Sequence, residues 1–363
     1  MHIDQLTPEA LERCAQRYEN YGARDASATA QKLWGARVVP LMAPAAAKGR
    51  YAGAPLSSPT RGCVGYMEYA AATEGVPYFN PDTIENILCL DGSLEVSWGT
   101  ALERSATLGR FDMVSMPAGV LHTVRNASAA TARALVVLNA GPTSEYPAVF
   151  ADDAHAAGID ETEALLLGVV FGGRGREAQD GEVEGRITRF ETLVPYKRQL
   201  NSNTGIPPAA TEWLTAGSVY PLVVPEGHVG RSQYAPVRGL PGLSLAIAEC
   251  EPGDGPLPHA HFDTQESFFV LDGQWDVTSG FRDELALAVK PYDLVAMPDK
   301  VMRAFKNTGT EKARLFVIIQ GRQKMSDLIA YTPEAGAEIE RRHGAATVEA
   351  FGRVNITFDA GLV

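Results

Sequence analysis

The sequence predicts an all-β protein that is built from two copies of one barrel, with a few helices at the periphery. From about Gly65 onward, short strand-like runs are separated by turns rich in Gly, Pro and Asn, a pattern typical of sandwich and barrel proteins. The same series of residues also occurs twice along the chain. A length of 363 residues is enough for two such domains.

The internal repeat is ungapped. Glu85 and Glu266 lie 181 positions apart (266 minus 85), and the same offset places Leu90-Asp91-Gly92 on Leu271-Asp272-Gly273. Self-similarity at a fixed period indicates repeated structural units, so two barrels are expected. The register continues through these identical pairs: Val96 and Val277, Gly99 and Gly280, Asp112 and Asp293, Met116-Pro117 and Met297-Pro298, Asn126 and Asn307, and Ala132-Arg133 and Ala313-Arg314.

Composition places the chain among ordinary globular proteins and argues against some partners. Apolar residues make up 45% of the chain and aromatic residues 8%. The formal net charge is −12, and the densest basic run is Arg341-Arg342-His343. Nucleic-acid binding requires clustered positive charge, which this sequence lacks. The basic run is better explained as the last turn of a helix.

The cysteines and the apolar pattern indicate a cytoplasmic protein. Cys14, Cys63, Cys89 and Cys250 show no C-x-x-C spacing, which fits free thiols in a reducing compartment. Cys89 and Cys250 lie in apolar runs and are expected in the core. No secretory signal is visible near residue 1, and no apolar stretch approaches the length of a membrane span. We therefore expect no membrane partner.

Helix signals occur near both ends of the chain. Thr7-Pro8-Glu9 combines an N-cap with proline at the first helical position, and this helix is expected to continue to about Tyr21-Gly22. Thr332-Pro333-Glu334 repeats that chemistry, with an expected end at Gly344 and strand-like residues from Val348 to Val363.

The segments outside the barrels predict self-association. The stretch from Lys32 to Tyr51 is expected to form an arm that packs on a barrel of its own chain or of a neighbouring subunit. With the C-terminal segment, this arm predicts a homodimer or a higher homo-oligomer. The expected divisions are residues 1–64 as N-terminal helix and arm, 65–142 as the first barrel, 143–218 as a linker, 219–322 as the second barrel and 323–363 as C-terminal helix and strand.

Three potential metal ligands occur in the second copy. Alternate side chains of a strand share one face, so His259 and His261 can point into one cavity while Ala260 points away. Glu266 lies five residues beyond His261, and a short turn can bring it back toward the histidines. The residues alone leave open that both histidines are partly buried and bonded to backbone groups.

The spacing from Gly253 to Gly273, G-x5-H-x-H-x4-E-x6-G, resembles the first signature of the cupin superfamily. This resemblance implies two double-stranded β-helix (jelly-roll) barrels. In that family a barrel holds a metal between two histidines, a glutamate and a third histidine. His259, His261 and Glu266 would supply three of these ligands in the second barrel.

The second cupin signature, P-x-G-x-x-H-x-x-x-N, matches the first copy from Pro117 to Asn126, and its histidine is His122. In the second copy the equivalent residue is Arg303. The glycine that usually precedes this motif is Phe111 in one copy and Tyr292 in the other, which puts the turn geometry in question. Neither copy therefore carries the whole ligand set.

The first barrel is expected to be mainly structural. It keeps Glu85 and His122 but has Tyr78 and Asn80 where the second copy has its two histidines. Glu85 and His122 alone would hold a divalent ion weakly, unless Tyr78 or Asn80 adds an oxygen ligand. The alternative is a neutral His122 imidazole that bonds to Glu85 or Tyr78 across the barrel.

Arg303 leaves two outcomes open for the second barrel. A guanidinium stays protonated, so it cannot bind a metal. Turned outward or upward, it can clamp the carboxylate or enolate of a metal-bound substrate through two parallel hydrogen bonds. Turned inward, it can pair with Glu266 and replace the metal, because a buried carboxylate needs a positive partner.

The leading interpretation is a metal-dependent, dioxygenase-like oxygenase that acts on a small anionic or hydroxylated organic substrate. It is similar in architecture to two-barrel dioxygenases. Two histidines and one carboxylate are the set that leaves positions open at ferrous iron, so Fe(II) is favoured, and Mn, Ni or Zn also suit these ligands. Arg303 would be the catalytic residue that fixes the substrate's charge. The alternatives are a non-catalytic or metal-free small-molecule-binding or storage-like protein, and a cupin isomerase, epimerase, lyase or decarboxylase.

Overall fold

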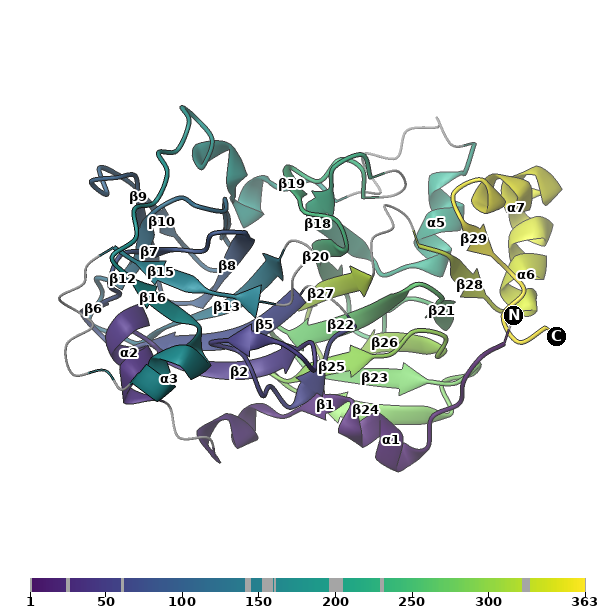
Figure 1. The fold of residues 1–363 in the computed structure, drawn as a ribbon. Helices are drawn as coiled ribbons and strands as arrows, with labels where there is room; N and C mark the ends of the chain where they lie inside the picture. Colours follow the sequence, from purple (N-terminus) through teal and green to yellow (C-terminus); the bar gives the residue numbers. More distant parts are fainter. Residues whose placement is uncertain are drawn as a thin grey trace. The chain divides into compact units, whose positions relative to one another are not determined.

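The computed structural model describes residues 2–23, 27–59, 62–140, 145–151, 159, 161–195, 205–228, 232–321 and 327–362. The chain divides into two compact units (Figure 1). The N-terminal unit is Asn20–Leu193, and the C-terminal unit combines Met1–Glu19 with Val194–Val363. Each unit is a jelly-roll barrel of two sheets, which confirms the all-β prediction.

The N-terminal barrel has one sheet in the strand order β17-β11-β8-β13-β5-β2-β4 and a second in the order β10-β9-β12-β7-β15-β16, with β6 paired to β12. A short parallel pair, β3 and β14, lies outside both sheets. The described α-helices of this unit are α2 (Ala28–Trp34) and α3 (Glu161–Leu167), and short 3-10 helices lie at Glu184–Arg186 and Phe190–Thr192. The strands are β2 (Arg37–Ala43), β3 (Lys48–Gly49), β4 (Leu56–Ser57), β5 (Gly62–Tyr69), β6 (Thr73–Glu74), β7 (Tyr78–Phe79), β8 (Thr83–Asp91), β9 (Leu94–Trp98), β10 (Arg104–Leu108), β11 (Met113–Met116), β12 (His122–Asn126), β13 (Ala132–Ala140), β14 (Glu145–Tyr146), β15 (Ala148–Phe150), β16 (Val169–Phe171) and β17 (Ile187–Thr188).

The C-terminal barrel repeats this topology, with sheets in the orders β1-β25-β22-β27-β20-β18-β19 and β24-β23-β26-β21-β28-β29. Its helices are α1 (Pro8–Arg13), α5 (Pro208–Leu214), α6 (Pro333–His343) and α7 (Ala345–Gly352). The strands are β1 (Ala15–Gln16), β18 (Ser218–Pro225), β19 (Val237–Gly239), β20 (Leu243–Cys250), β21 (His259–His261), β22 (Thr264–Val270), β23 (Trp275–Ser279), β24 (Leu285–Val289), β25 (Leu294–Met297), β26 (Arg303–Asn307), β27 (Ala313–Gly321), β28 (Ile329–Tyr331) and β29 (Ile356–Thr357).

The sequence repeat is also a repeat of strand register. Met113 pairs with Leu88 in the first barrel, and Leu294 pairs with Phe269 in the second, each 181 positions later. Register decides which side chains face the interior, because a slip of one residue reverses every side chain of a strand. The two barrels therefore present equivalent positions to their interiors.

The turns before the second signature have the left-handed backbone conformation that glycine usually adopts, although the residue there is not glycine. Phe111 has φ 67° and Tyr292 has φ 73°, both in the left-handed region that costs a non-glycine residue about 1 kcal/mol or more. Ring packing accompanies both turns: Phe111 lies edge-to-face on Phe190 at 5.6 Å, and Tyr292 on Tyr18 at 5.1 Å. The missing glycines thus alter neither turn.

The peripheral segments differ from expectation in three places. Helix α1 starts on its Thr7 cap as predicted but ends at Arg13, because Ala15–Gln16 form the strand β1, which pairs with β25. The expected arm contains β2, which pairs with β5 as a strand of the N-terminal barrel. Helix α6 ends before Gly344 as predicted. The prediction of strand-like residues from Val348 is wrong, since the chain continues as α7, and among the described residues that follow, β29 forms the strand.

The segment expected to be a linker contributes to the N-terminal barrel. Strand β15 pairs with β7, and β17 pairs with β11. At the other end of the chain, β29 pairs with β28 of the same chain, beside α6 and α7 in Figure 1.

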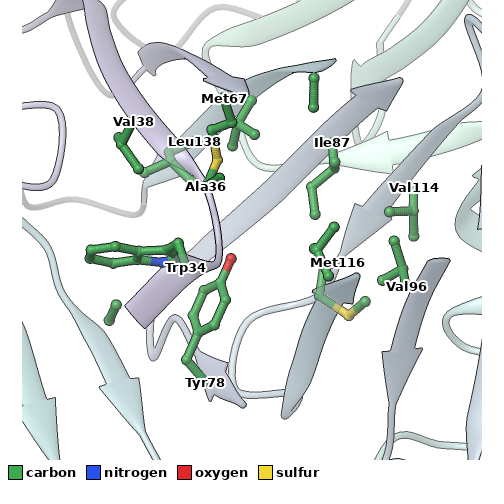
Figure 2. Close-up of a cluster of buried hydrophobic side chains, with 14 of the residues drawn as sticks. Trp34, Ala36, Val38, Met67, Tyr78, Ile87, Val96, Val114, Met116 and Leu138 are labelled. Carbon is green, nitrogen blue, oxygen red and sulfur yellow. The ribbon is translucent and has the colours of Figure 1, made fainter. Parts of the chain in front are cut away.

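Each barrel has its own apolar core. Figure 2 shows part of the N-terminal core, where Trp34 lies near Tyr78 and the Tyr78 hydroxyl points toward the middle of the cluster. Cys89 and Cys250 are buried as expected, and all four cysteines are free. In the described part of the chain, no helix combines the length and hydropathy needed to cross a bilayer.

Candidate metal centre

Strands β21 and β22 bring His259, His261 and Glu266 together inside the C-terminal barrel. Nε2 of His261 lies 3.4 Å from Oε2 of Glu266, and Nε2 of His259 lies 3.6 Å from the same oxygen. All three side chains are buried. Among the described residues they form a group whose ligand atoms all lie within 4.8 Å of one another.

The spacing of these atoms fits a shared cation better than hydrogen bonds. An N–H···O hydrogen bond measures about 2.7 to 3.2 Å, which is shorter than either contact. Donor atoms that each lie about 2.1 Å from one ion, at angles of about 90° to 110°, are about 3.0 to 3.4 Å apart. The His261 contact of 3.4 Å lies at the upper end of this range, and the His259 contact of 3.6 Å lies just beyond it. Oε2 of Glu266 is buried and accepts no hydrogen bond from the described residues. A cation would satisfy this oxygen.

Each imidazole is held through its other nitrogen. Nδ1 of His259 lies 2.8 Å from the carbonyl oxygen of Leu257. Nδ1 of His261 lies 2.5 Å from Oδ2 of Asp327. With the proton on Nδ1, both Nε2 atoms have a free lone pair on the side of Glu266, as metal-binding histidines require.

Asp327 is a site residue that sequence reasoning missed. It accepts hydrogen bonds from the Thr264 hydroxyl and from the backbone N–H of Asp263. Burial by itself raises the pKa of Asp327, but the nearby His261 and these hydrogen bonds outweigh burial and lower it. No spacing rule connects Asp327 to the histidine motif, because the contact depends on how β28 returns to β21.

The electrostatics of the cluster favour the metal-binding protonation states. Burial raises the pKa of Glu266, but His261, His259 and Arg303 outweigh it, and the pKa falls to about 2. Burial lowers the pKa of His259, with partial compensation from Glu266. At neutral pH the cluster therefore offers an ionised carboxylate beside a neutral His259 imidazole.

Arg303 points inward, the orientation in which it was expected to pair with Glu266 and replace the metal. It is opposite His259 in the pairing of β26 with β21, and its side chain is completely buried. Its NH1 atom lies 3.9 Å from Oε2 of Glu266, which is too long for a hydrogen bond. NH2 donates to the carbonyl oxygen of Pro298, whereas Nε and NH1 find no acceptor among the described residues. Nε and NH1 are thus buried donors that no described residue satisfies.

In the N-terminal barrel, Glu85 and His122 also converge. His122 Nε2 lies 3.4 Å from Oε2 of Glu85. The Tyr78 hydroxyl donates to Oε1 at 2.9 Å, and Asn80 Nδ2 donates to Oε2 at 2.6 Å. Tyr78 and Asn80 therefore act here as hydrogen-bond donors, and both carboxylate oxygens are occupied.

Arg50, which the sequence analysis did not single out, supplies the positive charge in this barrel. It is buried, its NH2 group donates to Oε1 of Glu85, and its NH1 group lies 3.2 Å from the Tyr78 hydroxyl oxygen. A hydrogen-bonded ion pair is thus formed here by Arg50, whereas Arg303 and Glu266 face each other at 3.9 Å without a hydrogen bond. A signal was available, since the offset of 181 places Gly49-Arg50 on Gly230-Arg231. Arg231 lies outside the described residues.

The fold and the paired signatures define the class of protein. The sequence matches the cupin domain family over residues 65–138 and 246–319, two ranges that differ by the same offset. The chain belongs to the cupin superfamily as a protein with two cupin domains.

Solved structures share this fold at low sequence identity. Oxalate decarboxylase from Bacillus subtilis at pH 4.6 aligns with a TM-score of 0.51 and 17% identity, covering 87% of this chain and 79% of that chain. The formate complex of Lactobacillus farciminis oxalate decarboxylase gives 0.50 and 16%, covering 87% and 91%. The 7S globulin of Momordica charantia gives 0.45 and 14%, covering 81% and 85%. A search of curated proteins finds no match.

Proposed function

We propose that the C-terminal barrel is the active site of a metal-dependent enzyme that acts on a small organic anion. The observation that carries this proposal is the convergence of His259, His261 and Glu266, whose ligand atoms lie within 4.8 Å of one another. Oε2 of Glu266 accepts no hydrogen bond from the part of the chain that the structure describes. His259, His261 and Glu266 would hold the divalent ion.

Arg303 binds the substrate in this proposal. Its Nε and NH1 groups are buried without an acceptor among the residues described, so a carboxylate or enolate oxygen would gain charge-assisted hydrogen bonds there. The hydrogen bond from NH2 to Pro298 holds the guanidinium in place before substrate arrives. The anion would contact both the Arg303 guanidinium and the bound divalent ion, so that a single substrate is attracted by two positive groups.

A bound divalent ion would supply Lewis-acid polarisation of the substrate oxygens and, as iron, oxygen chemistry. The side chains of the chain do the remaining work. Asp327 holds the His261 ring in orientation, Leu257 does the same for His259, and the buried setting excludes water from the anion. Fe(II) is the first metal to test, followed by Mn, Ni and Zn.

Oxygen-dependent cleavage is the first reaction to test, because two histidines and one carboxylate are the ligand set of ferrous oxygenases. Decarboxylation is the alternative, since a metal beside Arg303 would also polarise a carboxylate. The two bacterial structures compared above are oxalate decarboxylases, so oxalate belongs in the substrate panel. Measurement of oxygen uptake and CO2 release separates the two reactions, because oxygen-dependent cleavage consumes oxygen, whereas decarboxylation releases CO2 without consuming it.

The metal-free alternative also has an observation in its favour, which is the inward position of Arg303. In that case Glu266 and Arg303 would neutralise each other, and buried side chains such as Phe268, Met297 and Met302 would fill the barrel. The contact of 3.9 Å and the two N–H groups without an acceptor favour the metal-dependent reading instead.

Metal analysis of protein purified without chelators tests the proposal. We expect about one divalent ion per chain in the wild type and none in His259→Ala, with His122→Ala as the matched control that keeps its metal. Wild-type protein without metal after exposure to Fe(II), Mn(II), Ni(II) and Zn(II), or His259→Ala with unchanged metal, would contradict it.

A further inference from the structure

We propose that the N-terminal barrel contains a guanidinium-binding site whose ligand is Arg50 of the same chain. Trp34, Tyr51, Tyr78 and Glu85 form this site, which we call the Arg50 cage. The proposal does not rest on the function proposed for the other barrel. It implies that the N-terminal barrel keeps its interior filled and that a free guanidinium ion can replace the side chain when Arg50 is removed.

Three aromatic rings surround the guanidinium carbon of Arg50. Its distance to the ring centroid is 5.1 Å for Trp34, 5.2 Å for Tyr51 and 5.4 Å for Tyr78. All three lie within the range of about 6 Å over which the face of an aromatic ring attracts a cation. Cages of aromatic rings are a general way to recognise such cations.

Glu85 completes the site with a full negative charge. Its side chain is wholly buried, as is nearly all of Arg50, so neither charge is hydrated. Arg50 donates to Oε1, which also accepts from Tyr78, while Asn80 donates to Oε2. Burial raises the pKa of Glu85, but Arg50, His122 and Asn80 outweigh burial and lower it to about 2. The carboxylate therefore remains ionised as the counter-ion of Arg50.

The backbone around the cage is shaped to place Arg50. Strand β3, directly before Arg50, pairs in parallel with β14, and a Cβ on Gly49 would lie 2.6 Å from the carbonyl oxygen of Tyr146. A Cβ on Gly65 would lie 2.1 Å from Cε1 of Tyr51, so glycine leaves room for that ring beside the guanidinium. Two glycines thus provide the close contacts that the cage needs.

The contrast with the C-terminal barrel shows why this interior takes a guanidinium rather than a metal. Glu85 accepts hydrogen bonds on both oxygens, whereas Oε2 of Glu266 accepts none among the described side chains. Arg50 is permanently charged and would repel a divalent ion. The Tyr78 hydroxyl and the Asn80 amide donate to Glu85 here, at the positions of His259 and His261.

Chemical rescue of Arg50→Gly in the full-length chain tests the cage. Removing one partner of a buried ion pair is strongly destabilising, so the melting temperature should fall by roughly 10 °C. Guanidinium chloride at about 20 mM, far below denaturing concentrations, should recover a substantial part of this loss in Arg50→Gly and none in the wild type. Sodium chloride and urea at the same concentration serve as reagent controls.

The matched control variant is Leu138→Ala, which empties part of the same core without removing a charge. Its melting temperature should not respond to guanidinium. The proposal would be overturned if Arg50→Gly folds but guanidinium does not raise its melting temperature. It would also be overturned if guanidinium raises the melting temperature of Leu138→Ala to the same extent.

A double-mutant cycle covers the case in which Arg50→Gly does not fold. Arg50→Met combined with Glu85→Gln should melt higher than Arg50→Met alone, because both buried charges are then removed together. If the double variant lost as much melting temperature as the two single variants together, the proposal would be overturned.

Discussion

Replacing Arg303 by methionine separates the metal-dependent reading from the metal-free one. The guanidinium of Arg303 lies 3.9 Å from Oε2 of Glu266, where opposite unit charges attract by about 4 kcal/mol at an effective dielectric constant of about 20. Met has a similar volume, so Arg303→Met mainly removes the charge and leaves Glu266 without it. We expect metal-free Arg303→Met to lose about 3 to 5 kcal/mol of unfolding free energy.

A divalent ion should reverse this loss. The ion would supply Glu266 with positive charge. Because the variant lacks the guanidinium of Arg303, which repels a cation, it should bind the ion more tightly than the wild type does. Thermal unfolding with and without Mn(II) or Fe(II) under anaerobic conditions, together with titration calorimetry, measures both effects. Carboxylate binding to the metal-loaded variant should weaken by about 10- to 100-fold, as expected for the loss of charge-assisted hydrogen bonds.

Arg17→Met is the matched control, because Arg17 lies 3.3 Å from buried Asp293 in the same unit but outside the cluster. It should lose stability without recovering it on addition of metal. An Arg303→Met variant whose stability is equally low with and without metal would refute the metal-dependent reading.

Three further predictions follow from the geometry. Asp327→Asn weakens the contact that orients His261, so its metal affinity should fall by about 10- to 100-fold in calorimetry. The control Asp293→Asn should keep the wild-type affinity. Equal metal affinities of Asp327→Asn and the wild type would contradict a role for Asp327. His122→Ala should keep its metal content and its reaction rate, and a loss of either would place a functional centre in the N-terminal barrel. The pKa of Glu85 is lowered from 4.5 to about 2, so the stability that its ionised form contributes is fully present above about pH 4.5 and is lost as the pH falls toward 2. The unfolding free energy of Glu85→Gln should therefore fall less steeply with pH in this range than that of the wild type. An equal slope in the two proteins would count against the ion pair.

The barrels were predictable because their signals are local or periodic. Strand alternation places His259 and His261 on one face, and the fixed spacing to Glu266 accounts for the third member of the cluster. The repeat of 181 positions carries over to strand register, as the pairing of Met113 with Leu88 shows. Turn glycines were less informative, since Phe111 adopts the same left-handed conformation.

The missed features depend on contacts between distant segments. Helix α1 stops at Arg13 because the following residues pair with β25, which outweighs local helix propensity. Asp327 reaches His261 only through the pairing of β28 with β21. Arg50 precedes the predicted barrel range of 65–142, and apart from the repeat of Gly49-Arg50 at Gly230-Arg231 no pattern marks it as the partner of Glu85.

Crystals of protein purified without chelators, measured at the absorption edges of Fe, Mn, Ni and Zn, test the central claim most directly. The account predicts one anomalous peak per chain, within bonding distance of His259, His261 and Glu266, and none beside Glu85. A C-terminal barrel without a peak, with the Arg303 guanidinium hydrogen-bonded to Glu266, would contradict it.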